Sequence, residues 1–137
     1  MPLLPSWSDS LSVGNELLDK QHRHLITFFN RLADFSAARS PEAKAYFYCL
    51  LADGISLVEE HFCKEEEILH KNKCPNFQIH CAEHDEFREK LAVMLKDGVA
   101  GTLQAADIYS FVKCGLICHM RDRDLVDKLF MNDTLIV

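Results

Sequence analysis

Residues 61–84, HFCKEEEILHKNKCPNFQIHCAEH, carry the pattern from which the fold can be inferred. His61 and Glu65 stand four residues apart, and so do His80 and His84. Residues at this spacing lie one turn apart on the same face of a helix, where both side chains can reach a single metal ion. The stretch therefore predicts two consecutive helices that each carry metal-binding side chains.

Helical periodicity and helix-stop residues divide the rest of the chain in the same way. Four helices of similar length, short loops and the lack of an alternating strand pattern predict an all-α, up-down-up-down four-helix bundle with an irregular N-terminal arm. The expected helices run over Glu16–Ala38, from Ser40-Pro41 to Asn72, over Phe77–Asp97, and from Thr102 to Met131. Gly14-Asn15 precedes the first helix and Asn76 the third, as start signals. Gly98 and Gly101 are expected to end the third helix.

Composition indicates one globular domain over residues 1–137, because 48% of the residues are hydrophobic and 26% are charged. No apolar run reaches ~18 residues and no basic segment precedes an apolar one at the N-terminus, so we expect a cytoplasmic protein without a membrane partner. The net charge is −6, and Lys and Arg do not cluster, which argues against nucleic acid as a partner.

Six cysteines are interpreted as reduced thiols, because a chain of this length can build a core without disulfides. Cys114-x-x-x-Cys118 is the nearest approach to a zinc motif, and it lacks paired C-x-x-C knuckles. An alternative role for Cys114 and Cys118, one helical turn apart, is redox sensing.

Histidines in the other two expected helices point to a shared site. His22 falls on the apolar stripe of the first helix, and His119 is bracketed by apolar residues in the fourth. Since a buried imidazole without a partner is costly, inward histidines on all four helices indicate a common metal ligand set, and imidazoles with carboxylates suit iron. His24 and His70 lie off this pattern and are expected at the surface.

Taken together, these motifs resemble the hemerythrin family, in particular its bacteriohemerythrin-like single-domain members. The resemblance covers nearly the whole chain. It is carried by Trp7, Val13-Gly14, Asp19-Lys20-Gln21-His22, the segment His61 to Glu66, the segment His80 to His84, and His119 followed five residues later by Asp124.

The resemblance implies two non-haem iron ions bridged by an oxo or hydroxo group and two carboxylates. His80, His84 and His119 would bind one iron, His22 and His61 the other, and Glu65 and Asp124 would bridge the pair. Helical spacing alone does not select Asp124, which falls ~140° around an α-helix from His119, whereas Asp122 falls closer to that face. The family motif makes the choice.

Such a donor set leaves one octahedral position open, on the iron with two histidines. The resemblance therefore implies reversible binding of dioxygen, for carriage or storage, without catalytic turnover. The alternatives are an oxygen or redox sensor, a di-iron oxidase, peroxidase or nitric-oxide-handling enzyme, and a structural metal site. A reductase or other redox partner is possible for the oxidised form. Apolar side chains are expected to shield the bound oxygen, namely Leu25, Phe28, Phe62 and Leu116.

One position departs from the family pattern. Gly115 stands one turn before His119, where family members commonly carry a tryptophan. We expect the missing side chain to leave a cavity or channel beside the metals and to speed autoxidation. In the run Glu65-Glu66-Glu67 only Glu65 is in register with His61, so Glu66 and Glu67 are expected in solvent.

Overall fold

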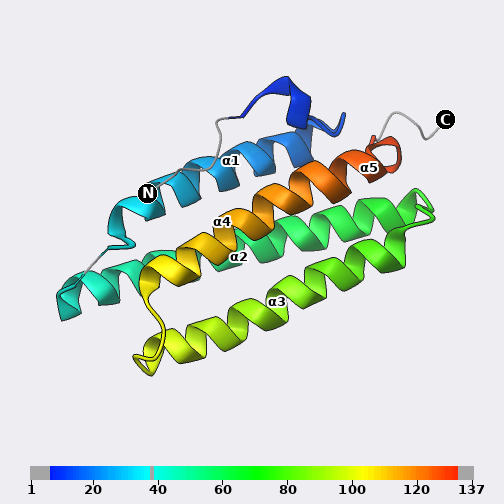
Figure 1. Cartoon of the computed structure of the whole chain (residues 1–137). Helices are drawn as coiled ribbons and strands as arrows, with labels where there is room; N and C mark the ends of the chain where they lie inside the picture. Colours follow the sequence, from blue (N-terminus) through cyan, green and yellow to red (C-terminus); the bar gives the residue numbers. More distant parts are fainter. Residues whose placement is uncertain (1–6, 38, 133–137) are drawn as a thin grey trace.

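Four long helices run alternately up and down along one bundle axis in the computed structural model, which describes residues 7–37 and 39–132 (Figure 1). Each helix packs against two neighbours, α1 and α3 both lying against α2 and α4. The part of the chain that is described holds no β-strand. The expected all-α, up-down-up-down bundle is thus confirmed, with helices α1 (Glu16–Leu32), α2 (Pro41–Lys71), α3 (Phe77–Val99) and α4 (Ala105–His119).

Side-chain caps start the first two helices where the sequence predicts them. The Asn15 side chain accepts a hydrogen bond from the backbone N–H of Leu18 at 3.1 Å. Ser40 Oγ accepts one from the N–H of Ala43 at 3.1 Å, and Pro41 takes the first helical position. These bonds satisfy N–H groups that have no partner within the helix, so local sequence is sufficient to set both starts.

The ends expected for the first and third helices are wrong. α1 ends at Leu32 and gives way to a 3₁₀ turn over Ala33–Phe35, while the predicted end, Ala38, lies outside the described residues. α3 runs on to Val99, so Gly98 does not stop it. A Cβ at Gly98 would collide with the Tyr48 side chain, which shows that this glycine allows close packing of two helices rather than ending one.

The fourth helix also differs from the prediction. It starts at Ala105, because the Thr102 hydroxyl donates to the carbonyl of Asp97 and completes the preceding turn instead of capping α4. Nor does it continue to Met131 as one α-helix. After His119 come a π-helical turn (Met120–Asp124), the short helix α5 (Leu125–Asp127) and a 3₁₀ turn (Lys128–Phe130).

The interior has two apolar layers with a polar layer between them. The larger apolar layer includes Leu25, Phe29, Phe62 and Leu116, and the smaller one includes Leu18 near the opposite end. The buried polar side chains between them come from α1, α2, α3 and the π-helical turn, and they are His22, His61, Glu65, His80, His84 and Asp124. His119 of α4 joins them at 11% exposure. Burying so many polar groups is costly unless they bind one another or a ligand.

The N-terminal arm packs along the start of α1. Its 3₁₀ turn spans Asp9–Leu11. The Asp19 carboxylate accepts hydrogen bonds from Val13 N–H at 2.9 Å and from Ser12 Oγ at 2.6 Å. The Trp7 ring lies 6.5 Å from the His22 ring, centroid to centroid, so the arm covers the α1 side of the polar layer.

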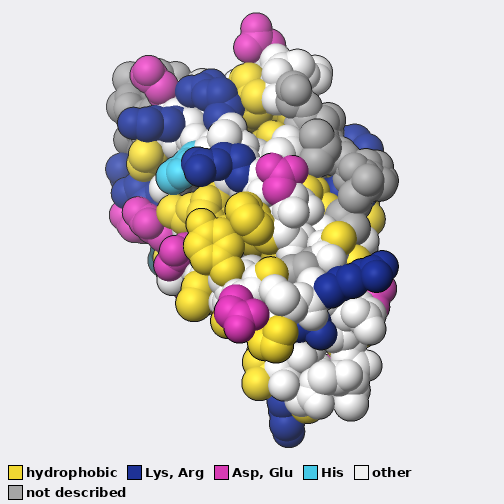
Figure 2. All heavy atoms as spheres, turned by 90° about the vertical axis from the view of Figure 1, so that its left-hand side faces the viewer, with side chains coloured by type: hydrophobic (Ala, Val, Ile, Leu, Met, Phe, Trp, Pro, Cys, Tyr) yellow, Lys and Arg dark blue, Asp and Glu magenta, His cyan; other side chains and the backbone are white. Residues whose placement is uncertain are grey.

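At the end of the bundle where α1 ends and α2 begins, hydrophobic side chains form a patch that is flanked by Lys/Arg and Asp/Glu side chains (Figure 2). Tyr46 near the start of α2 is 52% exposed, and its ring packs edge-on against Phe35. None of the described helices combines the length and apolar character needed to cross a bilayer.

Candidate metal centre

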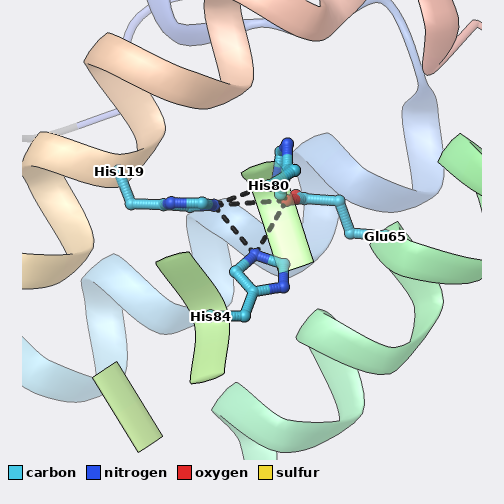
Figure 3. Close-up of side chains that lie close together, drawn as sticks. All are labelled: Glu65, His80, His84 and His119. Carbon is cyan, nitrogen blue, oxygen red and sulfur yellow. Dashed lines mark hydrogen bonds and ion pairs between the residues drawn. The ribbon is translucent and has the colours of Figure 1, made fainter. Parts of the chain in front are cut away.

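Three histidines and one glutamate converge between α2, α3 and α4 (Figure 3). The Nε2 atom of His119 lies 2.9 Å from that of His84 and 3.1 Å from that of His80. Glu65 Oε1 contacts His80 Nε2 and lies 3.3 Å and 3.4 Å from the Nε2 atoms of His84 and His119. We name this set the three-histidine group.

A second set of donor atoms lies beside it. Asp124 Oδ2 is 3.1 Å from His22 Nε2, and Glu65 Oε2 is 3.1 Å from His61 Nε2 and 3.6 Å from His22 Nε2. Within each set one ligand atom per residue lies within 4.8 Å of all the others, which is a spacing that one metal ion can span. We name His22, His61, Glu65 and Asp124 the two-histidine group.

Two carboxylates are shared between the groups. Glu65 directs Oε1 to the three-histidine group and Oε2 to His61 and His22. Asp124 directs Oδ1 to His119 at 2.9 Å and to His80 at 3.2 Å, and Oδ2 to His22. Each carboxylate thus offers one oxygen to each of two neighbouring positions, as a carboxylate that bridges two metal ions must do.

The π-helical turn explains why Asp124 reaches the centre although α-helical spacing favours Asp122. A π-helical turn closes hydrogen bonds between residues five apart, so residues 119 and 124 fall on one face. Asp122, three residues after His119, instead points outward, and its side chain is 70% exposed. Such turns within α-helices occur frequently at functional sites.

Burial and charge act against each other on the histidines. Burial alone would lower the pKa of His22, but the carboxylates of Asp124 and Glu65 raise it, to about 9. The same two carboxylates overcome burial at His80 and His119 and raise each pKa to about 10. Positive charge is therefore stabilised beside these imidazoles, whether it is carried by protons or by a metal ion.

Other members of the centre show the opposite balance. Burial lowers the pKa of His61 despite the nearby Glu65 carboxylate. The pKa of Asp124 lies well below its usual range, because its contacts with His119 and His22 outweigh burial and the repulsion of Glu65. Neighbouring imidazoles likewise hold the pKa of Glu65 down against burial. Both carboxylates are therefore ionised at neutral pH and available as ligands.

The donor set fits metal ions. Several of its buried atoms have no hydrogen-bond partner of good geometry among the described residues: His22 Nε2, His61 Nε2, Glu65 Oε2 and both Asp124 carboxylate oxygens. Buried polar atoms are rarely left in this state, and each of these atoms faces the interior of the centre. Imidazole and carboxylate donors without thiolates suit iron.

The Nδ1 atoms of four histidines point away from the centre and contact polar side chains for which the sequence predicts no role. His84 Nδ1 lies 2.7 Å from Glu66, and His80 Nδ1 lies 2.9 Å from Asp127. Expecting Glu66 in solvent was wrong, since it is 23% exposed and binds both His84 and Arg88. Glu67, at 69% exposed, lies in solvent as expected. The remaining outward contacts are His61 Nδ1 with Gln21 at 2.8 Å and His119 Nδ1 with Glu83 at 3.4 Å.

The cavity or channel expected beside Gly115 is present in part, because an aromatic ring fills some of the space and a pocket takes up the rest. A Cβ at Gly115 would lie 2.7 Å from Cε2 of the Phe87 ring, so this ring occupies the place of the absent side chain. A surface pocket of about 440 Å³ does lie alongside, lined by Gly115, Phe62, Phe87 and His119 among others. It borders the three-histidine group, where His119 is 11% exposed.

Of the four apolar residues expected to shield the centre, one contacts a ligand ring and the others belong to the larger apolar layer. Phe62 stacks on the His84 ring at 3.8 Å between centroids and so covers the three-histidine group directly. Leu25 and Leu116 are buried in the larger apolar layer, and Phe28 packs at its edge. His24 and His70 are exposed, as expected.

The cysteines stand apart from the donor set. Cys74 is buried and Cys81 half-buried, while Cys49, Cys63, Cys114 and Cys118 are exposed. Burial raises the pKa of Cys81 to about 11, and a hydrogen bond to Glu59 raises that of Cys63. Neither thiol is thereby activated as a nucleophile.

An up-down helical bundle with a buried centre of histidines and shared carboxylates defines a class of non-haem metal-binding proteins. The hemerythrin HHE cation-binding domain matches residues 13–126, and the chain belongs to the hemerythrin family. Membership of this family implies a di-iron site and an oxygen-related function.

Relatives are similar over most of their length. The chain is 30% identical to a hemerythrin-like protein of Naegleria gruberi over 123 residues, 90% of each chain. It is 26% identical to a myohemerythrin of Sipunculus nudus over 122 residues, 89% of each chain. It is 25% identical to a bacteriohemerythrin of Stenotrophomonas maltophilia (strain R551-3) over 118 residues, 86% of this chain and 75% of the relative. No solved structure matches the chain significantly.

Proposed function

We propose that this protein binds dioxygen reversibly at a non-haem di-iron centre and carries or stores it. The observation that supports this most directly is the sharing of two buried carboxylates, Glu65 and Asp124, between two groups of histidines. The proposed ligands are His80, His84 and His119 for one iron, His22 and His61 for the other, and the two carboxylates as bridges.

Unequal numbers of histidines leave the two positions unequal. Three imidazoles would occupy more of the coordination positions at the first metal than two imidazoles would at the second, which would leave the second with room for a small ligand beside His22 and His61. When bound, the iron pair supplies the electrons and the open coordination position that dioxygen needs. The protein supplies a dry surrounding, because His22 and His61 are 0% and 2% exposed.

Trp7 and Phe62 contribute to that surrounding next to different histidines. Trp7 lies over His22 from the N-terminal arm, and the Phe62 ring lies 6.2 Å from the His61 ring and stacks on His84. Side chains of this kind exclude water and external reductants from the centre, which favours release of intact dioxygen over its reduction. We also infer that the chain forms one domain, since all four helices contribute to the centre.

A second candidate is an enzyme or sensor that uses the same metals. The pocket beside His119 favours it, because its volume of about 440 Å³ accommodates a small molecule at the three-histidine side. A substrate or reductant bound there would lie close to the metal ligands.

Anaerobic reduction of iron-loaded protein, followed by oxygen admission and then oxygen removal, distinguishes the candidates. Reversible binding predicts two irons per chain and a visible band that appears with oxygen and disappears when oxygen is removed. Rapid, irreversible oxidation without such a species would overturn the proposal and favour the enzyme or sensor.

A further inference from the structure

The outward partners of the histidines differ between the two groups. In the three-histidine group every Nδ1 faces a carboxylate: Asp127 at 2.9 Å from His80, Glu66 at 2.7 Å from His84, and Glu83 at 3.4 Å from His119. In the two-histidine group, His61 Nδ1 faces the neutral amide oxygen of Gln21 at 2.8 Å. His22 Nδ1 has no hydrogen-bond partner among the described residues.

Other side chains hold two of these carboxylates in place. Asn76 donates to the second oxygen of Asp127 at 2.9 Å. Arg88 donates to Glu66 at 3.0 Å and is itself bound to Glu59. These contacts hold both carboxylates at a fixed distance from an imidazole, so each carboxylate acts on its imidazole in the folded protein before any metal binds.

A carboxylate behind an imidazole changes how the ring binds metal. It accepts the Nδ1 proton, fixes the tautomer that leaves Nε2 free to coordinate, and increases the electron density that Nε2 donates. An amide oxygen does the same more weakly because it carries no net charge. Rings backed by carboxylates therefore bind a metal cation more tightly than rings backed by an amide or by nothing.

We propose that Asp127 and Glu66 are positioning residues that make the three-histidine position the tighter of the two metal positions. The centre then fills first at the three-histidine group, and the metal beside His22 and His61 leaves first. This inference rests on the proposed di-iron centre and adds to it an order of loading that the ligand set alone does not give.

Competition with a chelator tests the order on the whole, iron-loaded protein. Protein with two ferrous ions is equilibrated anaerobically with increasing concentrations of a chromogenic ferrous chelator, and the iron left per chain is counted. The wild type should lose iron in two steps separated by a plateau at one iron per chain. Asp127→Asn and Glu66→Gln should each lower the affinity for the more tightly held iron by about 10- to 100-fold. The affinity for the other iron should change little.

Two further variants make the test specific. Gln21→Glu places a carboxylate behind His61 and should strengthen the looser step, so that the first iron leaves at higher chelator concentration. Asp122→Asn removes an acid that is 70% exposed and touches none of the histidines, and it should change neither step. A change that only loosened the fold would weaken both steps, so far-UV circular dichroism accompanies each measurement.

Two results would overturn the inference. They are loss of both irons in one step from the wild type, or a shift of only the looser step in Asp127→Asn and Glu66→Gln. If Asp127→Asn fails to fold, Glu66→Gln still decides, since Glu66 lies near the surface. A protein that never holds two irons would instead refute the proposed function, so the two failures can be told apart.

Discussion

Replacing Gly115 with alanine tests the packing beside the centre, because two effects of known size oppose each other there. Alanine stabilises a helix interior by about 1 kcal/mol relative to glycine. The new Cβ would lie 2.7 Å and 2.9 Å from two atoms of the Phe87 ring, and that ring also stacks on Phe111 and meets Phe62 edge-on. Overpacking of this kind typically costs about 1–3 kcal/mol. We therefore expect Gly115→Ala to lower the free energy of unfolding by about 1 kcal/mol.

A matched control removes the Phe87 ring, which is the group that the new Cβ would contact. In a Phe87→Ala background the same Gly115→Ala change should stabilise the protein by about 1 kcal/mol, since only helix propensity remains. The coupling between the two sites is then about 2 kcal/mol, which is within the range found for residues in contact. Urea unfolding of the four proteins without metal measures it, because bound metal would disturb two-state behaviour. Gly115→Ala that stabilises both backgrounds equally would refute the close contact.

The remaining predictions concern the bridge, a helix start and pH. Asp124→Asn should lower the iron content below two per chain while Asp122→Asn leaves it unchanged, and equal iron contents would contradict the assigned bridge. Asn15→Ala should lower the free energy of unfolding by about 1–2 kcal/mol, since its side chain caps α1 and bonds a distant carbonyl, and an unchanged urea midpoint would exclude this. Burial lowers the pKa of His80 and of His119, but Asp124 and Glu65 outweigh it and raise both from 6.5 to about 10. Without metal, the protonated histidines therefore stabilise the fold fully below pH 6.5, and this stabilisation is lost as the pH rises towards 10. Stability that is constant between pH 7 and 10 would contradict this.

Local sequence was sufficient for the starts of the first two helices and for most of the candidate ligands. Asn15 and Ser40-Pro41 set helix starts through bonds made within the first turn, so no distant residue is needed to predict them. His61 with Glu65, and His80 with His84, lie one turn apart on continuous α-helix, where residues four apart must share a face. These features depend only on neighbours along the chain.

The position of Asp124 could not be predicted from α-helical geometry. Regular spacing places Asp122 nearer the face of His119, and only the resemblance to the family singled out Asp124. The π-helical turn reverses the order, because it brings residues five apart into register. A change of helix type at one turn leaves no clear signal in composition or periodicity.

Contacts between helices were decided by the tertiary structure alone. Glu66 and Asp127 face histidines that are 18 and 47 residues away in sequence, so a helical pattern viewed by itself assigns Glu66 to solvent and gives Asp127 no role. The Phe87 ring fills the space at Gly115 from a different helix. The sequence by itself determined the number and order of the long helices and the inward histidines, since both follow from periodicity, but it did not determine where several of those helices end. Which carboxylates lie behind those histidines depends on how the helices pack, and only the assembled bundle decides it.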